Sequence, residues 1–239
     1  NMNLIITMAG RYSRFIEEGY RLPKYLLPWG DHPILKVIIS KLNSNNSFKN
    51  VYFIANKRDE VYMPHVKKII RSFGIPLDNL FLISDTSGQA ETASKAISLI
   101  CKKFTSLEGG VVFHNIDTIL FNRDIDEISN ALRDSDGYID IFKSSNHNYS
   151  YVLIENDIVR SIAEKIVISN NASSGMYAFK NIDIFNQYYS QEMLYISDIY
   201  KGMIEDGASI VAGCVYSEDE TLVLGTPSEY LAKAYILNN

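Results

Sequence analysis

The stretch that decides the fold is MAGRYSRFIEEGYRLPKYLLPWG, residues 8–30, which directly follows the apolar run NLIIT. It carries four basic residues, Arg11, Arg14, Arg21 and Lys24, together with three glycines. A glycine after a buried strand lets the backbone approach a phosphate, whose charge arginine and lysine side chains then neutralise. The patterns GxxxxGK[ST] and GxGxxG are absent, so the stretch is neither a Walker loop nor a dinucleotide fingerprint. The alternative interpretation is a solvated surface loop with scattered cations.

The overall composition limits the kind of protein this is. The chain has 239 residues, 46% hydrophobic and 21% charged, with a formal net charge of -5. An acidic balance disfavours a general nucleic-acid binder, and no apolar run approaches the ~20 residues of a membrane span. The two cysteines, Cys101 and Cys214, lack metal-binding spacing. We therefore expect a cytoplasmic enzyme in a reducing compartment, with no signal peptide, no membrane insertion and no nucleic-acid partner.

Short apolar runs alternate with helical patterns through the first half of the chain. We expect strands over residues 3–8, 50–55, 79–84 and 109–117, and helices from residue 33 and over 58–73 and 89–104. Strict alternation of strand and helix predicts a parallel sheet with helices on both faces. Ligands of such sheets bind where the carboxyl ends of the strands gather their loops.

The second half has a different pattern. Residues 138–145, 149–156 and 157–165 alternate between apolar and polar side chains, which predicts antiparallel strands. Further strands are expected over 173–181 and 209–216, and helices over 182–189, 196–206 and 226–238, the last capped by Thr226 with Pro227 in first position. The whole chain is predicted to be one mixed α/β domain, 1–239, with a nucleotide half over about 1–120 and an acceptor half over about 121–239.

Five later motifs follow the first stretch in order: SGQAET (87–92), NID (115–117), AEK (163–165), SSGMYAFK (173–180) and LGTPSEY (224–230). Together with MAGxxSRF, they resemble the GT-A-like nucleotidyltransferases. These are the sugar-1-phosphate nucleotidylyltransferases and related cytidylyltransferases of surface polysaccharide synthesis, and the closest likeness is to their short capsule-pathway members. The resemblance covers most of the chain. It implies a three-layer, Rossmann-type α/β domain with a mostly parallel mixed central sheet and an antiparallel acceptor-side subsheet.

The resemblance also implies a role for each matching residue. Arg14 would hold the leaving phosphates, Lys24 would contact the phosphates near the reacting phosphorus, and Lys165 would hold the acceptor phosphate. The residues implied for the nucleotide are Met8, Ala9, Gly10, Arg11, Ser13, Ser87, Gly88, Gln89 and Thr92. Those implied for the acceptor are Asn115, Glu164, Ser174 and Gly175. The alternative interpretations are a capped strand-to-helix turn at residues 87–92 and a surface Glu-Lys pair at 164–165, whereas Tyr177 and His114 are expected in the core.

A metal site is expected at Asp117, which ends the fourth predicted strand. Mg²⁺ prefers one or two carboxylates together with phosphate oxygens and waters. The alternative is a structural turn or helix-capping aspartate. The family's second metal aspartate falls at Val223 in this chain, so either another acid, for which we choose Asp198, or a single carboxylate with waters would hold the ion.

The implied reaction joins an NMP from an NTP to a phosphorylated acceptor and releases pyrophosphate. The acceptor is expected to be a sugar 1-phosphate or a small phosphorylated alcohol or amino acid in capsule or other surface polysaccharide synthesis, and CTP is slightly favoured over UTP or dTTP. A homodimer is left open. Two other functions compete: a glycosyltransferase of the same fold that uses a nucleotide-sugar, and a non-catalytic nucleotide-binding regulator.

Overall fold

The computed structural model describes residues 1–237, with side chains described through residue 234. Residues 238–239, which include the last position of the helix expected over 226–238, lie outside the described part. Within residues 1–237, no helix is long and apolar enough to cross a membrane.

The core of the molecule is a nine-stranded sheet formed within the described residues, in the order β5-β4-β1-β6-β11-β8-β12-β10-β9. Its strands are β1 (Met2–Met8), β4 (Asn50–Asn56), β5 (Leu80–Ile83), β6 (Gly110–Asn115), β8 (Gly137–Lys143), β9 (Ser150–Glu155), β10 (Ile158–Glu164), β11 (Asn171–Phe179) and β12 (Ile210–Tyr216). Two small two-stranded ladders lie beside it: β2 (Pro28–Trp29) with β3 (His32–Pro33), and β7 (Thr118–Leu120) with β13 (Thr221–Val223).

Parallel pairing is concentrated in the first half of the chain. There β1 pairs in parallel with β4 and β6, and β4 pairs in parallel with β5. In the second half, β11 is antiparallel to β6 and β8, and β10 is antiparallel to β9 and β12, while β8 and β12 are parallel. The expected mixed α/β fold with an antiparallel acceptor-side part is therefore confirmed.

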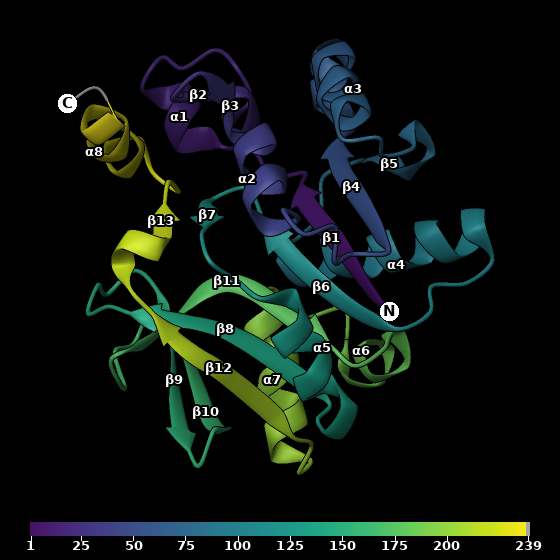
Figure 1. The fold of residues 1–239 in the computed structure, drawn as a ribbon, viewed down its shortest axis with the longest axis vertical. Coiled ribbons are helices and arrows are strands. Elements are labelled where there is room, and N and C mark those ends of the chain that lie inside the picture. Colours follow the sequence, from purple (N-terminus) through teal and green to yellow (C-terminus); the bar gives the residue numbers. More distant parts are fainter. Residues whose placement is uncertain (238–239) are drawn as a thin grey trace.

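Helices cover both faces of this sheet and complete three layers. The covering helices are α2 (Ile34–Leu42), α3 (Met63–Ser72), α4 (Gln89–Phe104), α5 (Ile125–Asp134), α6 (Ile182–Tyr188) and α7 (Ile196–Glu205), whereas α1 (Ser13–Glu17) and α8 (Pro227–Leu237) lie together beside the small ladders (Figure 1). Apolar residues of α2, α3 and α5 share one buried cluster with the sheet, and those of α4, α6 and α7 share a second. Burying apolar area on both faces is the main free energy that holds the layers together.

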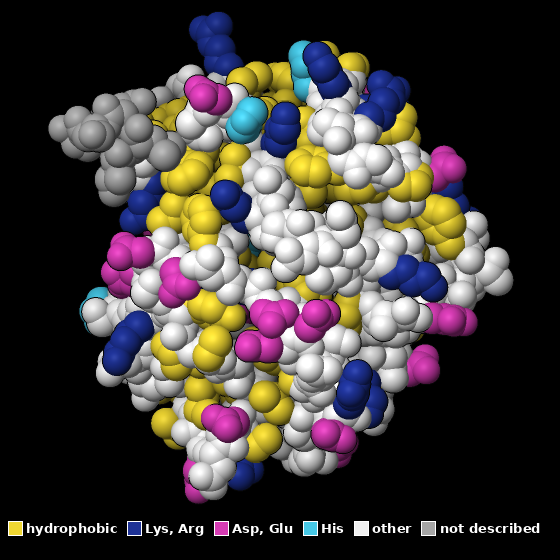
Figure 2. All heavy atoms as spheres, viewed as in Figure 1, with side chains coloured by type: hydrophobic (Ala, Val, Ile, Leu, Met, Phe, Trp, Pro, Cys, Tyr) yellow, Lys and Arg dark blue, Asp and Glu magenta, His cyan; other side chains and the backbone are white. Residues whose placement is uncertain are grey.

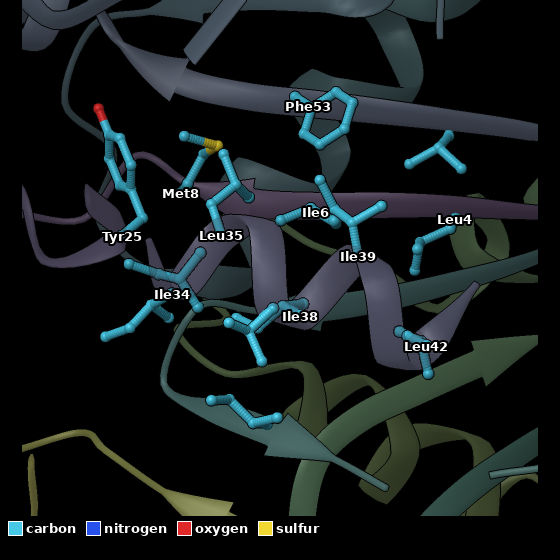
Figure 3. Packing of buried hydrophobic residues seen from close by; sticks show 14 of the residues in the cluster. Leu4, Ile6, Met8, Tyr25, Ile34, Leu35, Ile38, Ile39, Leu42 and Phe53 are labelled. Atoms are coloured by element: carbon cyan, nitrogen blue, oxygen red, sulfur yellow. The ribbon is translucent and has the colours of Figure 1, made fainter. Parts of the chain in front are cut away.

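The packing of α2 on β1 shows how the sequence fixes these layers. The side chains of Ile34, Leu35, Ile38, Ile39 and Leu42 recur at helical spacing and are all buried. They lie against Leu4, Ile6 and Met8 of β1, as Figure 3 shows. Because β1 is covered on both faces, its apolar run is continuous rather than alternating, as in the buried strands of parallel sheets.

The last described elements return to the first half of the molecule. In Figure 1 the chain reaches the lower half through β8–β12, and then β13 and α8 run back up beside α1. The Tyr230 ring of α8 packs edge-on against Phe15 and Tyr20, and its hydroxyl donates to the Pro28 carbonyl. Residues 221–230 therefore join the two halves, and Pro227 occupies the first helical position as expected.

Several short elements were not predicted. These are α1, the turn at Lys24–Leu26, the two small ladders and α5. The helix expected over 58–73 begins as a 3-10 segment at Lys57–Tyr62 and becomes α-helical only at Met63. Acidic and basic side chains are interspersed over the face drawn in Figure 2.

Candidate active site

A pocket of about 340 Å³ opens where β1 and β6 end and α4 begins. It lies at the carboxyl edge of the parallel strands, the position that the strand-helix alternation predicts. Ten of the predicted residues line it: Met8, Ala9, Gly10, Arg11, Lys24, Gly88, Gln89, Thr92, Asn115 and Asp117. Residues that are far apart in the sequence therefore meet in one cavity, which we call the nucleotide pocket after the role that the sequence motifs imply for it.

Gly10 and Gly88 both line this pocket, but the structure requires a glycine only at the second position. A Cβ on Gly10 would meet nothing within 4 Å, so no protein atom requires a glycine there. The open space leaves the backbone accessible to a ligand. A Cβ on Gly88 would instead lie 2.6 Å from the Leu194 carbonyl oxygen, so that glycine is required by the close approach of the segment before α7.

The first turn of α4 faces the nucleotide pocket. Gln89 begins this sixteen-residue helix and lines the pocket. The free N–H groups and partial positive charge of a helix N-terminus favour an anionic ligand. Thr92 is buried, and its hydroxyl bonds the Thr86 hydroxyl at 2.7 Å and the Gly88 carbonyl at 3.1 Å, which fixes the turn.

Arg11 belongs to a charged cluster at the rim of this pocket. Its guanidinium donates to Asp85 at 2.6 Å, and Arg58 donates to the same carboxylate at 2.7 Å and to the Gly10 carbonyl at 3.1 Å. Asn56 also donates to Asp85. These hydrogen bonds, that of Arg11 first, lower the pKa of Asp85 to about 2. Asp85 therefore anchors the loop that follows β1.

Lys24 and Asp117 meet at the base of the nucleotide pocket. The Lys24 ammonium donates to the Asp117 carboxylate and, at 2.9 Å, to the Gly225 carbonyl. It also lies 4.9 Å from the centroid of the Phe15 ring. The Lys24 side chain is 7% exposed and that of Asp117 is 42% exposed, so the lysine is fixed and the carboxylate is open to the pocket.

Backbone contacts hold Asp117 in place. Its N–H donates to the Asn115 side-chain oxygen at 2.9 Å, and its carbonyl accepts from the Leu224 N–H at 2.6 Å. The NID turn is thus fixed from both sides, by its own asparagine and by the segment that returns before α8. A carboxylate oriented in this way is positioned before any ligand arrives.

A second pocket of about 260 Å³ adjoins the first and shares Gln89, Asn115 and Asp117 with it. It also contains the predicted residues Arg14, Glu164, Lys165, Ser174 and Gly175. We call this cavity the acceptor pocket. The two cavities meet at the carboxylate of Asp117, so ligands in both would be neighbours there.

Gly175 and Lys165 have unusual backbone geometry in the acceptor pocket. Gly175 has φ +93°, and a Cβ there would lie 2.8 Å from the Asn115 side-chain nitrogen. Glycine is therefore required both by the left-handed conformation and by the approach of Asn115. Lys165 also has a positive φ, of 58°, while its N–H donates to the Tyr149 carbonyl at 3.2 Å. A left-handed lysine costs free energy, and such strain often accompanies a functional site.

Three predicted residues lie in neither pocket. Ser13 is exposed on α1. Ser87 is exposed, and its N–H and hydroxyl both donate to the Glu91 carboxylate within the turn. Asp198, expected as a metal ligand, lines neither of the pockets that meet at Asp117, and its carboxylate accepts the N–H groups of Leu194 and Tyr195 and caps α7. The structural interpretations of Tyr177 and His114 as buried residues are confirmed.

The sequence interpretation missed several residues that line the two pockets. Around the nucleotide pocket these are Thr7, Tyr12, Asp85, Thr86 and Ile116, and around the acceptor pocket they include Asn148, Tyr149, Ser150, Tyr195, Thr226 and Glu229. Most belong to loops whose path depends on tertiary packing. One available signal was LGTPSEY, whose glutamate was read only as part of a motif.

Three comparisons place this geometry among known proteins. No family model matches the chain. The bifunctional protein GlmU of Methanococcus aeolicus is 27% identical over 183 residues, which is 75% of this chain, and the chain spans only 40% of that protein's length. The nucleoside-diphosphate-sugar pyrophosphorylase from Vibrio cholerae RC9 has a TM-score of 0.83 at 25% identity, covering 97% of this chain and 99% of that one. The inositol-1-phosphate CTP transferase from T. maritima has a TM-score of 0.72 at 12% identity, covering 98% and 94%.

The protein therefore has the fold of the nucleotidyltransferases, and its two adjoining pockets lie where that fold gathers its loops. Its structural neighbours are sugar-phosphate nucleotidylyltransferases. This confirms the resemblance found in the sequence motifs and supports an enzyme of the nucleotidyltransferase class.

Proposed function

We propose that this protein transfers a nucleotidyl group from an NTP to a phosphorylated acceptor and releases pyrophosphate. The observation that carries the proposal is the junction of the two pockets at Gln89, Asn115 and Asp117, with basic side chains on both sides. Residues about 1–120 supply most of the nucleotide half, and about 121–239 supply most of the acceptor half. Two anions repel each other, so a site that brings them together needs positive charge at their meeting point.

Three basic side chains would supply this positive charge. Lys24 lies at the base of the nucleotide pocket, where it would face the phosphates near the reacting phosphorus. Arg14 and Lys165 both line the acceptor pocket, and neither forms an ion pair within the described part of the chain. Arg14 would hold the departing pyrophosphate and Lys165 the acceptor phosphate. A phosphate oxygen is already a competent nucleophile, so alignment and charge neutralisation carry the reaction.

The residues present fit a Mg²⁺ ion held through one protein carboxylate. Among the described residues, no group of three or more His, Cys, Asp or Glu side chains forms a metal cage. Asp117 gives one carboxylate oxygen to Lys24 and is exposed at the junction of the pockets. One carboxylate with substrate phosphates and waters is a usual Mg²⁺ coordination. When bound, the ion would neutralise charge on phosphate oxygens, while Asn115 and Leu224 keep Asp117 oriented.

We further propose CTP, ahead of UTP or dTTP, as the nucleotide. This choice is supported by Val223 at the position of the family's late aspartate and by a CTP transferase among proteins of this fold. The MAGxxSRF resemblance supports a sugar 1-phosphate, or another small phosphorylated alcohol or amino acid, as the acceptor in capsule or other surface polysaccharide synthesis.

The test is pyrophosphate release from each of the four NTPs with Mg²⁺ and a panel of phosphorylated acceptors. We expect release that depends on both an NTP and an acceptor, with the highest rate for CTP. Binding of nucleotide-sugars with no pyrophosphate release from any pairing would contradict the proposal. Omission of Mg²⁺ and addition of EDTA, measured in parallel, test the metal separately.

A further inference from the structure

The acceptor pocket contains a second glutamate that the motif resemblance does not assign. Glu229 lies in the first turn of α8 and lines this pocket together with Glu164. A Cβ on Gly225 would lie 3.7 Å from a carboxylate oxygen of Glu229 and 3.8 Å from Asp117 Cγ. Glu229 and Asp117 therefore both border the space beside the Gly225 Cα.

Neutral hydroxyl groups fix both glutamates. Glu229 accepts from the Tyr149 hydroxyl at 2.9 Å and from the Thr226 hydroxyl at 3.0 Å. Glu164 accepts from the Ser150 hydroxyl and, at 3.3 Å, from the Ser197 hydroxyl. Ser150 begins β9 and Ser197 lies on α7, whereas Tyr149 and Thr226 directly precede β9 and α8. Each carboxylate is thus held by two hydroxyl donors and has a defined orientation.

Neither glutamate has a cationic partner among the described residues. A partly buried carboxylate without such a partner is costly unless further hydrogen bonds are supplied to it. An ionised carboxylate only accepts hydrogen bonds. A ligand that replaces water at Glu164 and Glu229 must therefore donate hydrogen bonds or carry positive charge.

The other charged residues of the pocket already have partners or assigned roles. Lys165 suits the acceptor phosphate, Arg14 is assigned to the departing pyrophosphate, and Asp117 is paired with Lys24. Once Lys165 holds the acceptor phosphate, the two glutamates remain for the rest of the acceptor. A second anionic group on the acceptor would meet like charge there.

We propose that Glu229, oriented by Tyr149, determines acceptor specificity together with Glu164. The acceptor has hydrogen-bond donors, hydroxyl or ammonium, at the end remote from its phosphate, and acceptors with a second anionic group are rejected. This inference rests on the proposed function, because it takes the second pocket to be the acceptor site. It gives LGTPSEY a role in substrate choice.

The experiment measures binding and needs no turnover. α-D-Glucose 1-phosphate, α-D-glucosamine 1-phosphate and α-D-glucuronic acid 1-phosphate are titrated into the protein by calorimetry. They share a ring and a phosphate, and differ in carrying a hydroxyl, an ammonium or a carboxylate group. We expect the wild type to bind the first or second at least about tenfold more tightly than the third, since one hydrogen bond to a charged group is worth about that factor. Which of the first two binds better identifies the donor as hydroxyl or ammonium.

Glu229→Gln keeps the shape of the side chain and removes its charge, so we expect the preference against the glucuronate to fall about tenfold. Tyr149→Phe removes the orienting hydroxyl and should change the preference in the same direction, which preserves the test should the first variant not fold. Glu205→Gln, at an exposed position at the end of α7, is the matched control and should retain the wild-type preference.

An unchanged preference in folded Glu229→Gln would overturn the inference, as would equal binding or no binding of all three compounds to the wild type. Pyrophosphate release by the wild type is measured separately. Release together with an unchanged preference in Glu229→Gln removes only the specificity role of Glu229. A Glu229-dependent preference without release under any pairing removes the proposed reaction and retains the specificity of the pocket.

Discussion

Lys24 and Asp117 are 93 residues apart in the sequence, yet they form an ion pair where the nucleotide and acceptor pockets meet. The same lysine donates to the Gly225 carbonyl, 201 residues along the chain. Three distant segments therefore converge on one ammonium group. Because the lysine is almost fully buried and the aspartate is half exposed, the pair presents a fixed cation beneath an accessible carboxylate.

Replacing either member of this pair should stop the reaction. We expect Lys24→Ala and Asp117→Ala each to lower the rate of pyrophosphate release on the order of 100-fold or more, because each removes a charge from the place where the reacting phosphates meet. Circular dichroism should show a retained fold in both. Lys68→Ala, at an exposed position on α3, is the control and should be as active as the wild type. Near-normal activity of either site variant would exclude that residue from the mechanism.

Gly175→Ala tests the contact between the acceptor pocket and Asn115. The new methyl would lie 2.8 Å from the asparagine nitrogen, so Asn115, and with it Asp117, must shift. Gly207→Ala is a matched control, since Gly207 also has a positive φ, of 81°, but a Cβ there would meet nothing within 4 Å. Both should lose about 1 kcal/mol of stability from backbone strain. Only Gly175→Ala should raise the KM for the acceptor or lower kcat, as steady-state kinetics would show; equal kinetics in the two variants would contradict this reasoning.

The buried ion pair of Arg123 with Asp140 should matter for stability. Arg123 donates to Asp140 at 2.8 Å and to the carbonyls of Phe121 and Glu220, and its guanidinium lies 3.8 Å from the centroid of the Tyr216 ring. Arg123→Met leaves Asp140 buried without its partner, so we expect a loss of about 3–5 kcal/mol in the free energy of unfolding in urea. Arg160→Ala, which breaks an exposed pair with Glu155, should cost less than about 1 kcal/mol.

Because of His114, we expect the folded protein to lose stability in mild acid. Burial lowers its pKa to about 4, and one ring nitrogen donates to the Thr118 carbonyl while the other has no partner among the described residues. The folded state therefore takes up this proton less readily than the unfolded state, whose pKa is about 6.5. The contribution of His114 is complete above pH 6.5 and is lost as the pH falls towards 4.

Urea unfolding between pH 7 and pH 4 measures this effect. His114→Gln removes the titrating group and should show a shallower loss of stability over that range than the wild type. Identical pH dependence in the two proteins would mean that the imidazole does not carry the effect.

The sequence predicted those parts of the fold whose pattern is local. The continuous apolar runs of β1 and β4 appear where they were expected, since burial on both faces requires them. The periodic segment of α4 also appears as expected, although no side chain caps its N-terminus. The ladder of β7 with β13 was missed, because it depends on contacts such as Arg123 with Glu220 rather than on periodicity. The five-residue α1 was missed because it is too short for a periodic pattern and packs through Phe15 against Tyr20 and Tyr230.

In the candidate site too, the residues that belong to local motifs could be predicted, and those placed by tertiary contacts could not. Gly10, Lys24 and Asp117 could be named because each belongs to a motif with fixed spacing, and the structure brings them into one pocket. Asp198 was chosen from its residue type alone, and its carboxylate instead caps a helix. Glu229 and Tyr149 could not be paired from the sequence, since 80 residues separate them and only the return of α8 brings them together.

The return of α8 to the first half also sets an order in which the two pockets can be assembled. Every residue that lines the nucleotide pocket lies between Thr7 and Asp117, whereas the acceptor pocket needs residues from Arg14 to Glu229. A ribosome would finish all the side chains of the first pocket about a hundred residues before it supplies those that close the second. During synthesis the growing chain would therefore carry every residue that lines the first pocket before the last residues that line the second.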